Sequence, residues 1–89
     1  MQIKEGFILR SLKDEHVVLG EGLAQVNFDS IVTLNNSATY LWENVQGKEF
    51  TTLELATLLT EKYDVNMETA LADAARWVEK LKAKGIIIN

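Results

Sequence analysis

The spacing of hydrophobic and polar positions changes about one third of the way along the chain. Before that point, β-branched and aromatic residues gather in short runs at 7–12, 16–20 and 30–34, separated by polar or glycine-containing stretches. Such runs are typical of strands, and three in sequence most simply form an antiparallel meander. Residues 24–28 alternate apolar and polar side chains, which fits either a strand extension or a loop with two anchored side chains.

The first predicted helix follows directly on the strand at 30–34. Its apolar positions recur at i, i+3, i+4 and i+7, the spacing of one helix face: Ala38, Leu41, Trp42 and Val45. Either Asn35 or Asn36 serves as its N-cap, and Gly47 suits the left-handed position beyond its end. Because only one or two residues separate strand from helix, we expect the sheet and the helices to pack as one body.

Two further helices are predicted from caps and apolar stripes. Thr51 and Glu54 have the spacing of a capping box, and Asn66 can cap a third helix from about Met67 to Lys84. The apolar positions are Leu55, Ala56, Leu59 and Tyr63 in the second helix, and Met67, Ala70, Leu71, Ala74, Val78 and Leu81, flanked by Trp77, in the third.

Gly85 ends the third helix, and residues 86–88 form either a buried tail or a very short strand. The expected fold is therefore α+β and winged-helix-like, with a three-stranded antiparallel sheet followed by three helices. We expect one domain over residues 1–89, since proline is absent and no linker composition interrupts the chain.

The composition of the chain indicates the compartment in which it works and argues against some classes of binding partner. The chain of 89 residues is 47% hydrophobic and has no cysteine, which fits a reducing cytoplasm. It contains no apolar run near the roughly 20 residues of a membrane span, and its start does not resemble a signal peptide. Nine basic and thirteen acidic residues give a net charge of −4, which argues against non-specific nucleic-acid binding.

Catalytic chemistry has little support. Without cysteine, Cys–His catalysis is excluded, and any serine triad would need His16, which stands beside Asp14 and Glu15 and is interpreted as a surface histidine. The glycines at 20 and 22 lack the lysine and helix of a phosphate loop, and the acidic residues lack calcium-loop spacing. We expect no enzyme activity, no metal and no cofactor.

Two binding functions stay open on the pattern alone. The winged-helix order allows DNA binding through the third helix, although its first turns carry Glu68 and Asp73, which have the wrong sign for phosphate. A small meander also has an exposed edge, which can capture a peptide strand. The segment 30–34 has no proline and no lysine that would prevent another strand from pairing with it. Alternatively, the segment is a central strand, or the C-terminal tail covers its edge.

A family resemblance decides between these alternatives. Leu34-Asn35-x-Ser37-Ala38, followed by Leu41-Trp42 and Gly47, resembles the LN-x-[TS]-A … G signature of the PqqD family. The later features also match, in order: Leu55-Ala56, Leu59, Tyr63, Asp73, Trp77-Val78, Leu81 and Gly85-Ile86-Ile87. The match covers about residues 7–88. Proteins similar to PqqD are noncatalytic peptide-recognition domains, also called RiPP recognition elements, with three strands followed by three helices.

The resemblance implies a partner and a groove. The partner is the leader of a ribosomally synthesised precursor peptide, which the domain presents to a modifying enzyme, often a radical SAM protein. The leader is expected to add as a strand beside the third strand, against the third helix. The implied groove residues are Ser30, Ile31, Val32, Thr33 and Leu34 on one wall and Asp73, Arg76, Trp77 and Lys80 on the other.

Other roles for these residues stay open. Val32 and Leu34 can be purely core residues, and Trp77 is expected to pack inside rather than face the groove. Arg76 and Lys80 can pair with acidic leader residues or be simply solvated. The resemblance does not establish a role in pyrroloquinoline quinone synthesis, and the expected monomer can also dimerise through the free strand edge.

Overall fold

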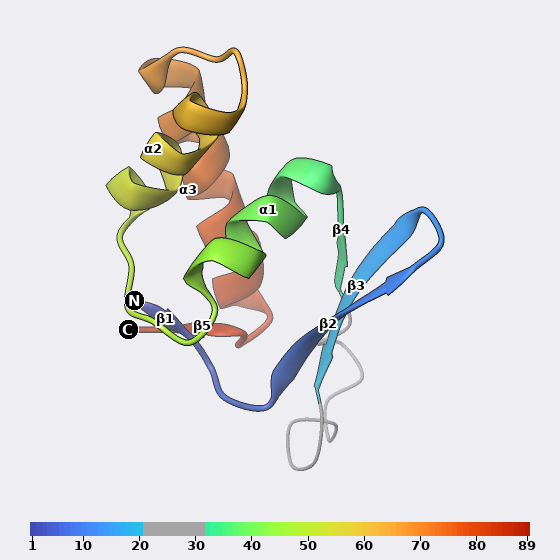
Figure 1. Ribbon diagram of the computed structural model, residues 1–89. Helices are drawn as coiled ribbons and strands as arrows, with labels where there is room; N and C mark the ends of the chain where they lie inside the picture. The colour runs from blue at the N-terminus through green and yellow to red at the C-terminus, as the bar shows by residue number, and fades with distance from the viewer. Residues whose placement is uncertain (21–31) are drawn as a thin grey trace.

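The computed structural model describes residues 1–20 and 32–89. A three-stranded antiparallel sheet of order β2-β3-β4 precedes three helices, and a separate two-stranded ribbon joins β1 to β5 (Figure 1). The elements are β1 (Gln2–Ile3), β2 (Phe7–Leu12), β3 (Glu15–Gly20), β4 (Val32–Leu34), α1 (Asn36–Val45), α2 (Thr52–Lys62), α3 (Met67–Ala83) and β5 (Ile87–Ile88). The expected α+β order of three strands and three helices is confirmed.

The hairpin β2–β3 turns more tightly than its sequence predicts. Leu12 pairs with Glu15, so only Lys13 and Asp14 form the turn, and Lys13 adopts a positive φ of 55°. Glu15, expected in the turn, belongs to β3. The hairpin projects away from the helices (Figure 1), and its far side carries no strand among the described residues.

β4 lies on the other side of β3 and leads directly into α1. Its register is His16↔Leu34, Val17↔Thr33 and Val18↔Val32. Val32 and Leu34 are buried and Thr33 is exposed, the alternation of a strand with one face on the core. Two predicted parts of this region, the first two residues of the 30–34 strand (Ser30 and Ile31) and the 24–28 segment, lie outside the described residues.

The helix caps agree with the sequence. Asn35, rather than Asn36, caps α1, and its side chain accepts from the Ala38 N–H at 2.8 Å. Thr51 and Glu54 form the predicted capping box of α2. Asn66 caps α3 by accepting from the Thr69 N–H, also at 2.8 Å. Each cap pairs an amide that the helix itself leaves unpaired, which fixes where the helix begins.

α3 is the central helix, and most of its predicted stripe is buried: Ala70, Ala74, Trp77, Val78 and Leu81. Met67 and Leu71 are exceptions, at 39% and 37% exposed. Leu71 lies about 75° from the middle of the buried stripe at 3.6 residues per turn, and Met67 belongs to the first turn. Both residues of the predicted apolar stripe are therefore more exposed than its other members.

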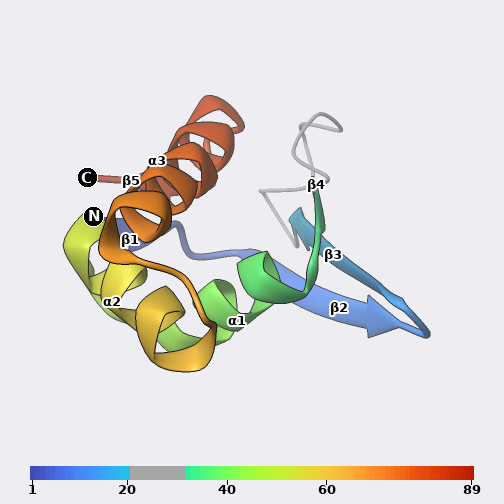
Figure 2. The same cartoon turned by 90° about the horizontal axis from the view of Figure 1, so that it is seen from above.

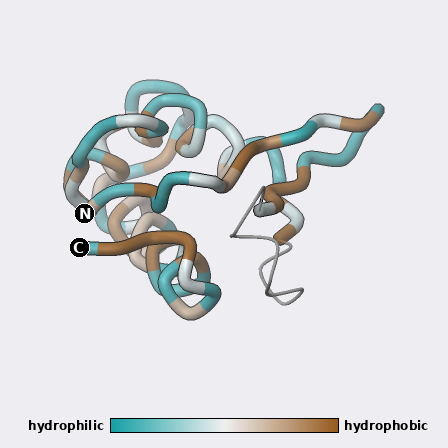
Figure 3. Tube along the Cα trace, turned by 90° about the horizontal axis from the view of Figure 1, so that it is seen from below, coloured by the Kyte–Doolittle hydropathy of each residue, from teal (hydrophilic) through white to brown (hydrophobic). Residues whose placement is uncertain are grey.

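The C-terminal tail pairs with the N-terminus rather than with β4. β5 joins β1 with the register Gln2↔Ile88 and Ile3↔Ile87, so the chain ends lie side by side (Figures 1 and 3). Met1 adds two hydrogen bonds to Phe50, one through its amino group at 3.0 Å and one through its carbonyl at 2.8 Å. Of the two predicted forms of the tail, the short strand is present, whereas β1 was not predicted.

Candidate functional site

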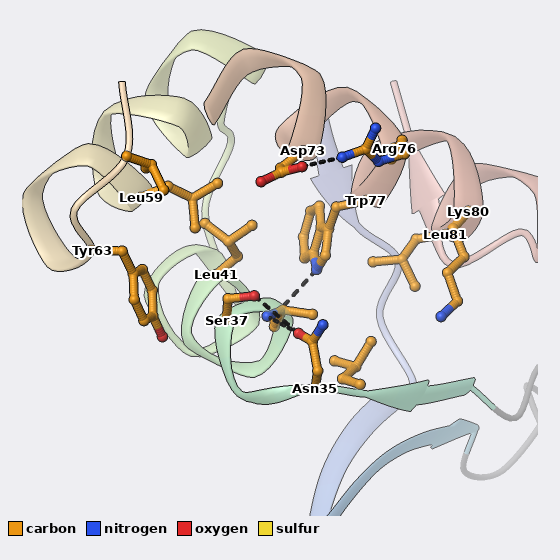
Figure 4. A pocket seen from close by; sticks show the side chains of 13 residues that line it. Asn35, Ser37, Leu41, Leu59, Tyr63, Asp73, Arg76, Trp77, Lys80 and Leu81 are labelled. Atoms are coloured by element: carbon orange, nitrogen blue, oxygen red, sulfur yellow. Dashed lines mark hydrogen bonds and ion pairs between the residues drawn. The ribbon is translucent and has the colours of Figure 1, made fainter. Parts of the chain in front are cut away.

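A groove of about 570 Å³ lies between the start of α1, the end of α2 and one face of α3 (Figure 4). Five of the nine residues implied by the resemblance line it: Leu34, Asp73, Arg76, Trp77 and Lys80. Its other lining residues are Asn35, Ser37, Ala38, Leu41, Leu59, Tyr63, Val65 and Leu81. The groove therefore combines an apolar interior with a polar rim supplied mainly by α3.

Trp77 is both a core residue and part of the groove wall. Its side chain is 6% exposed and lies edge-on to Phe50, with ring centroids 5.9 Å apart. The indole Nε1–H donates to the Ala38 carbonyl at 3.2 Å, which ties α3 to the first turn of α1 (Figure 4). Trp77 packs inside as expected, and by fixing the two helices it sets the groove's width.

The rim of the groove carries charge. The Arg76 guanidinium forms an ion pair with Asp73, one turn earlier on α3, and the two side chains are 72% and 43% exposed. An exposed pair of this kind stabilises the fold by at most about 1 kcal/mol, because water screens it. Arg76 therefore has a partner already, but one that an acidic ligand can replace at small cost.

Lys80 connects the rim to β4. Its ammonium donates to the Thr33 carbonyl at 3.3 Å, across 47 positions of sequence. The contact places this carbonyl on the side of β4 that faces α3. In an antiparallel ladder the N–H and C=O of one residue point to the same side, so the Thr33 N–H also faces α3. Thus β4 presents a donor and an acceptor toward α3, and no strand within 1–20 and 32–89 pairs with them.

The groove extends further along the helices than the sequence indicated. Leu41, Leu59 and Tyr63 lie on the predicted apolar stripes of the first two helices, and Val65 lies between the second and third predicted helices. Tyr63 lies edge-on to Tyr40, with centroids 6.1 Å apart, and marks the end of the groove near α2. One signal in the sequence was available: Tyr63 is the last apolar stripe position of the second predicted helix. At the end of a helix, a stripe residue can reach the protein surface.

The rest of the described chain shows no arrangement for catalysis or metal binding. His16 lies between Ser11 Oγ at 2.7 Å and Asn36 Oδ1 at 3.2 Å, in an exposed network that does not line the groove. The residues described include no group of three or more metal-ligating side chains. No helix among them has the length and apolar character needed to cross a membrane.

The described residues also give no support to DNA binding. The first turn of α3, which would read bases, exposes Glu68 and Thr69. The lysines of α3 gather in its last turn instead. A recognition helix needs the opposite arrangement, because its first turns approach the phosphates and base edges.

Comparisons with known proteins agree with this geometry. The family model of coenzyme PQQ synthesis protein D (PqqD) matches residues 15–87. A solved structure of TbiB1 in complex with the TbiA(beta) leader peptide matches with a TM-score of 0.72 and 20% sequence identity, over 97% of this chain and 93% of that chain. A search of curated protein sequences gives no match. At 20% identity the structural match establishes a shared fold.

Proposed function

This chain belongs to the PqqD family, and we propose that it captures the leader of a ribosomally synthesised precursor peptide by β-strand addition. In this proposal, residues 1–89 act as one noncatalytic recognition domain that presents the leader to a peptide-modifying enzyme. A radical SAM enzyme is the partner that the family resemblance suggests. The structural neighbour TbiB1, solved with a leader peptide, supports the ligand class.

One observation carries the proposal: within residues 1–20 and 32–89, no strand pairs with the edge of β4 that lies beside an apolar groove. The Thr33 N–H and carbonyl face α3, and β5, which might have covered them, pairs with β1. An added strand would gain main-chain hydrogen bonds whatever its sequence, while alternate side chains enter the groove and provide selectivity. A covered edge would leave only a shallow apolar depression with no strand template.

The proposed site offers the leader two kinds of contact, main-chain hydrogen bonds and apolar side-chain packing. Thr33 supplies main-chain groups, while Leu34 and Trp77 belong to the apolar wall that would receive leader side chains. Val32 is buried on the core face, and its main-chain groups, which alternate with those of Thr33, face β3. We therefore assign Val32 a supporting role. Ser30 and Ile31 precede the described part of β4 and stay in the proposed site only as its continuation in sequence.

The same geometry identifies the substitution that tests strand addition. Thr33→Pro removes the N–H that faces α3, whereas Thr33→Val keeps this donor and serves as the matched control. Proline is tolerated on an edge strand when its missing N–H lies on the unpaired side. Circular dichroism checks that both variants fold.

The ligand for this test is a synthetic leader from a short precursor gene, to be sought among the neighbours of the gene for this chain. We expect Thr33→Pro to weaken its binding roughly two- to tenfold, the value of one net hydrogen bond, and Thr33→Val to bind like the native chain. Independently, amide exchange at Thr33 in the native chain should slow when the leader is added. A leader that binds without protecting this amide would contradict strand addition.

A further inference from the structure

A side chain from α3 contacts the edge of β4 that no other strand of the described residues covers. Segment 30–34 itself contains no lysine. However, Lys80 of α3, whose side chain is drawn in Figure 4, donates to the Thr33 carbonyl at 3.3 Å. Lysine near an exposed strand edge is a common protection against pairing with another chain, because a strand that docks there must displace or desolvate the ammonium. Here the lysine binds the very acceptor that an added strand would use.

The surroundings of Lys80 leave few other roles for it. The positions three and four residues away on α3, where helix side chains meet, are Trp77, Arg76, Ala83 and Lys84, so no carboxylate is within helical pairing distance. The only ion pair among the described residues joins Asp73 to Arg76. Favourable interaction with the dipole at the end of α3 applies equally to Lys82, which does not line the groove.

We propose that Lys80 is an exchangeable cap on the β4 edge: it occupies the Thr33 carbonyl in the free protein and yields to a strand that brings a carboxylate for its ammonium. The second half of this proposal rests on the proposed function. A docking strand replaces the Lys80 contact with its own N–H and leaves an ammonium without an acceptor, beside the Arg76 guanidinium. An acidic ligand residue at that point restores a partner, so the cap selects leaders with a carboxylate near the Thr33 register.

The free protein tests the cap without any ligand. Lys80→Met keeps the length and the apolar stem of the side chain but removes the donor, and Lys82→Met is the matched control in the same turn of α3. Sedimentation velocity over a concentration series should show Lys80→Met dimerising at a roughly fivefold lower concentration than the native chain, the upper range for one exposed charged contact. Lys82→Met should behave like the native chain.

A double variant shows whether that dimer forms through β4. Adding Thr33→Pro to Lys80→Met should return the chain to native self-association, because the edge then lacks a donor. If Lys80→Met associates no more than the native chain, or if Thr33→Pro does not reverse its association, the cap is overturned. Matching thermal melts of the single variants check that the fold is intact.

The synthetic leader tests the second half. Changing each of its Asp or Glu residues in turn to Asn or Gln should identify one position at which native affinity falls roughly two- to fivefold. The same change should have no effect on binding to Lys80→Met. A leader that binds natively with no such position overturns the carboxylate selection. A leader that fails to bind the native chain counts against the proposed function, and the sedimentation result still decides whether Lys80 caps the edge.

Discussion

The two small β-structures of this protein differ in position: one joins the two ends of the chain, and the other borders the groove. The ribbon joins β1 and β5 from the two ends of the chain, and Ile86 and Ile87 anchor it in the core at 0% and 3% exposed. β4 is also anchored in the core, with Val32 and Leu34 each 3% exposed. Nevertheless its second edge faces a groove rather than another strand of the described chain. The comparison shows that the apolar C-terminal strand β5 pairs with β1 and does not cover β4.

Disrupting the packing of the C-terminal segment that carries the ribbon should have the largest effect on stability. Ile86→Ala removes a fully buried side chain next to α3 and should lower the free energy of unfolding by about 2–5 kcal/mol, measured by urea denaturation. Ile88→Ala, at a residue 39% exposed in the same ribbon, is the control and should cost less than about half as much. Equal costs would show that burial does not distinguish the two positions.

Substitution of Trp77, which belongs to both the core and the groove wall, should cause the next largest loss of stability. Trp77→Phe keeps an aromatic ring but removes the Nε1–H that binds the Ala38 carbonyl, so we expect a loss of about 1–2 kcal/mol in unfolding free energy and a weaker leader complex. Trp42→Phe is the comparison, because the described residues give its buried Nε1 no acceptor. It should cost less stability, and a greater loss would show that the indole hydrogen bond of Trp77 contributes little.

Helix caps can separate stability from binding. Asn35→Ala and Thr51→Ala each remove an N-cap and should each lower the free energy of unfolding by about 1 kcal/mol. Asn35 lines the groove and Thr51 does not. Leader affinity, measured by fluorescence anisotropy, should therefore fall only for Asn35→Ala. If both variants bind the leader equally well, the groove does not extend to the cap of α1.

The smallest effect is expected at the exposed rim. Arg76→Glu breaks a solvent-exposed pair with Asp73 and should change the free energy of unfolding by no more than about 1 kcal/mol. A leader with an acidic residue nearby should bind roughly two- to fivefold more weakly, as measured by calorimetry. Unchanged affinity would remove Arg76 from the proposed site. Arg10→Glu, on the exposed hairpin, controls for net charge.

Local chemistry made the helices predictable. Asn35, Thr51 and Asn66 cap their helices through contacts with residues three positions further on, so the sequence alone contains both partners. β1 could not be predicted in this way, because two residues at Gln2–Ile3 carry no periodicity and their partner lies at the other end of the chain. Topology that depends on distant segments leaves no short-range pattern.

The site was predicted in part for the same reason. The family resemblance indicated both walls, and five of the nine implied residues do line one groove. The Lys80–Thr33 contact joins residues 47 positions apart, so a search for lysine within segment 30–34 missed the residue that guards it. The groove's extension to Tyr63 and Val65 was missed because helix periodicity marks an apolar face without showing where the neighbouring helix stops covering it.

The ribbon formed by the two chain ends has a consequence for engineering. β1 and β5 are adjacent (Figure 2), and neither lines the groove. The whole fold could therefore be inserted into a surface loop of a host protein, with both connections at neighbouring points. Such an insertion would stretch neither flank and would leave the leader's approach unobstructed. The fold is thus suited to domain insertion into another protein.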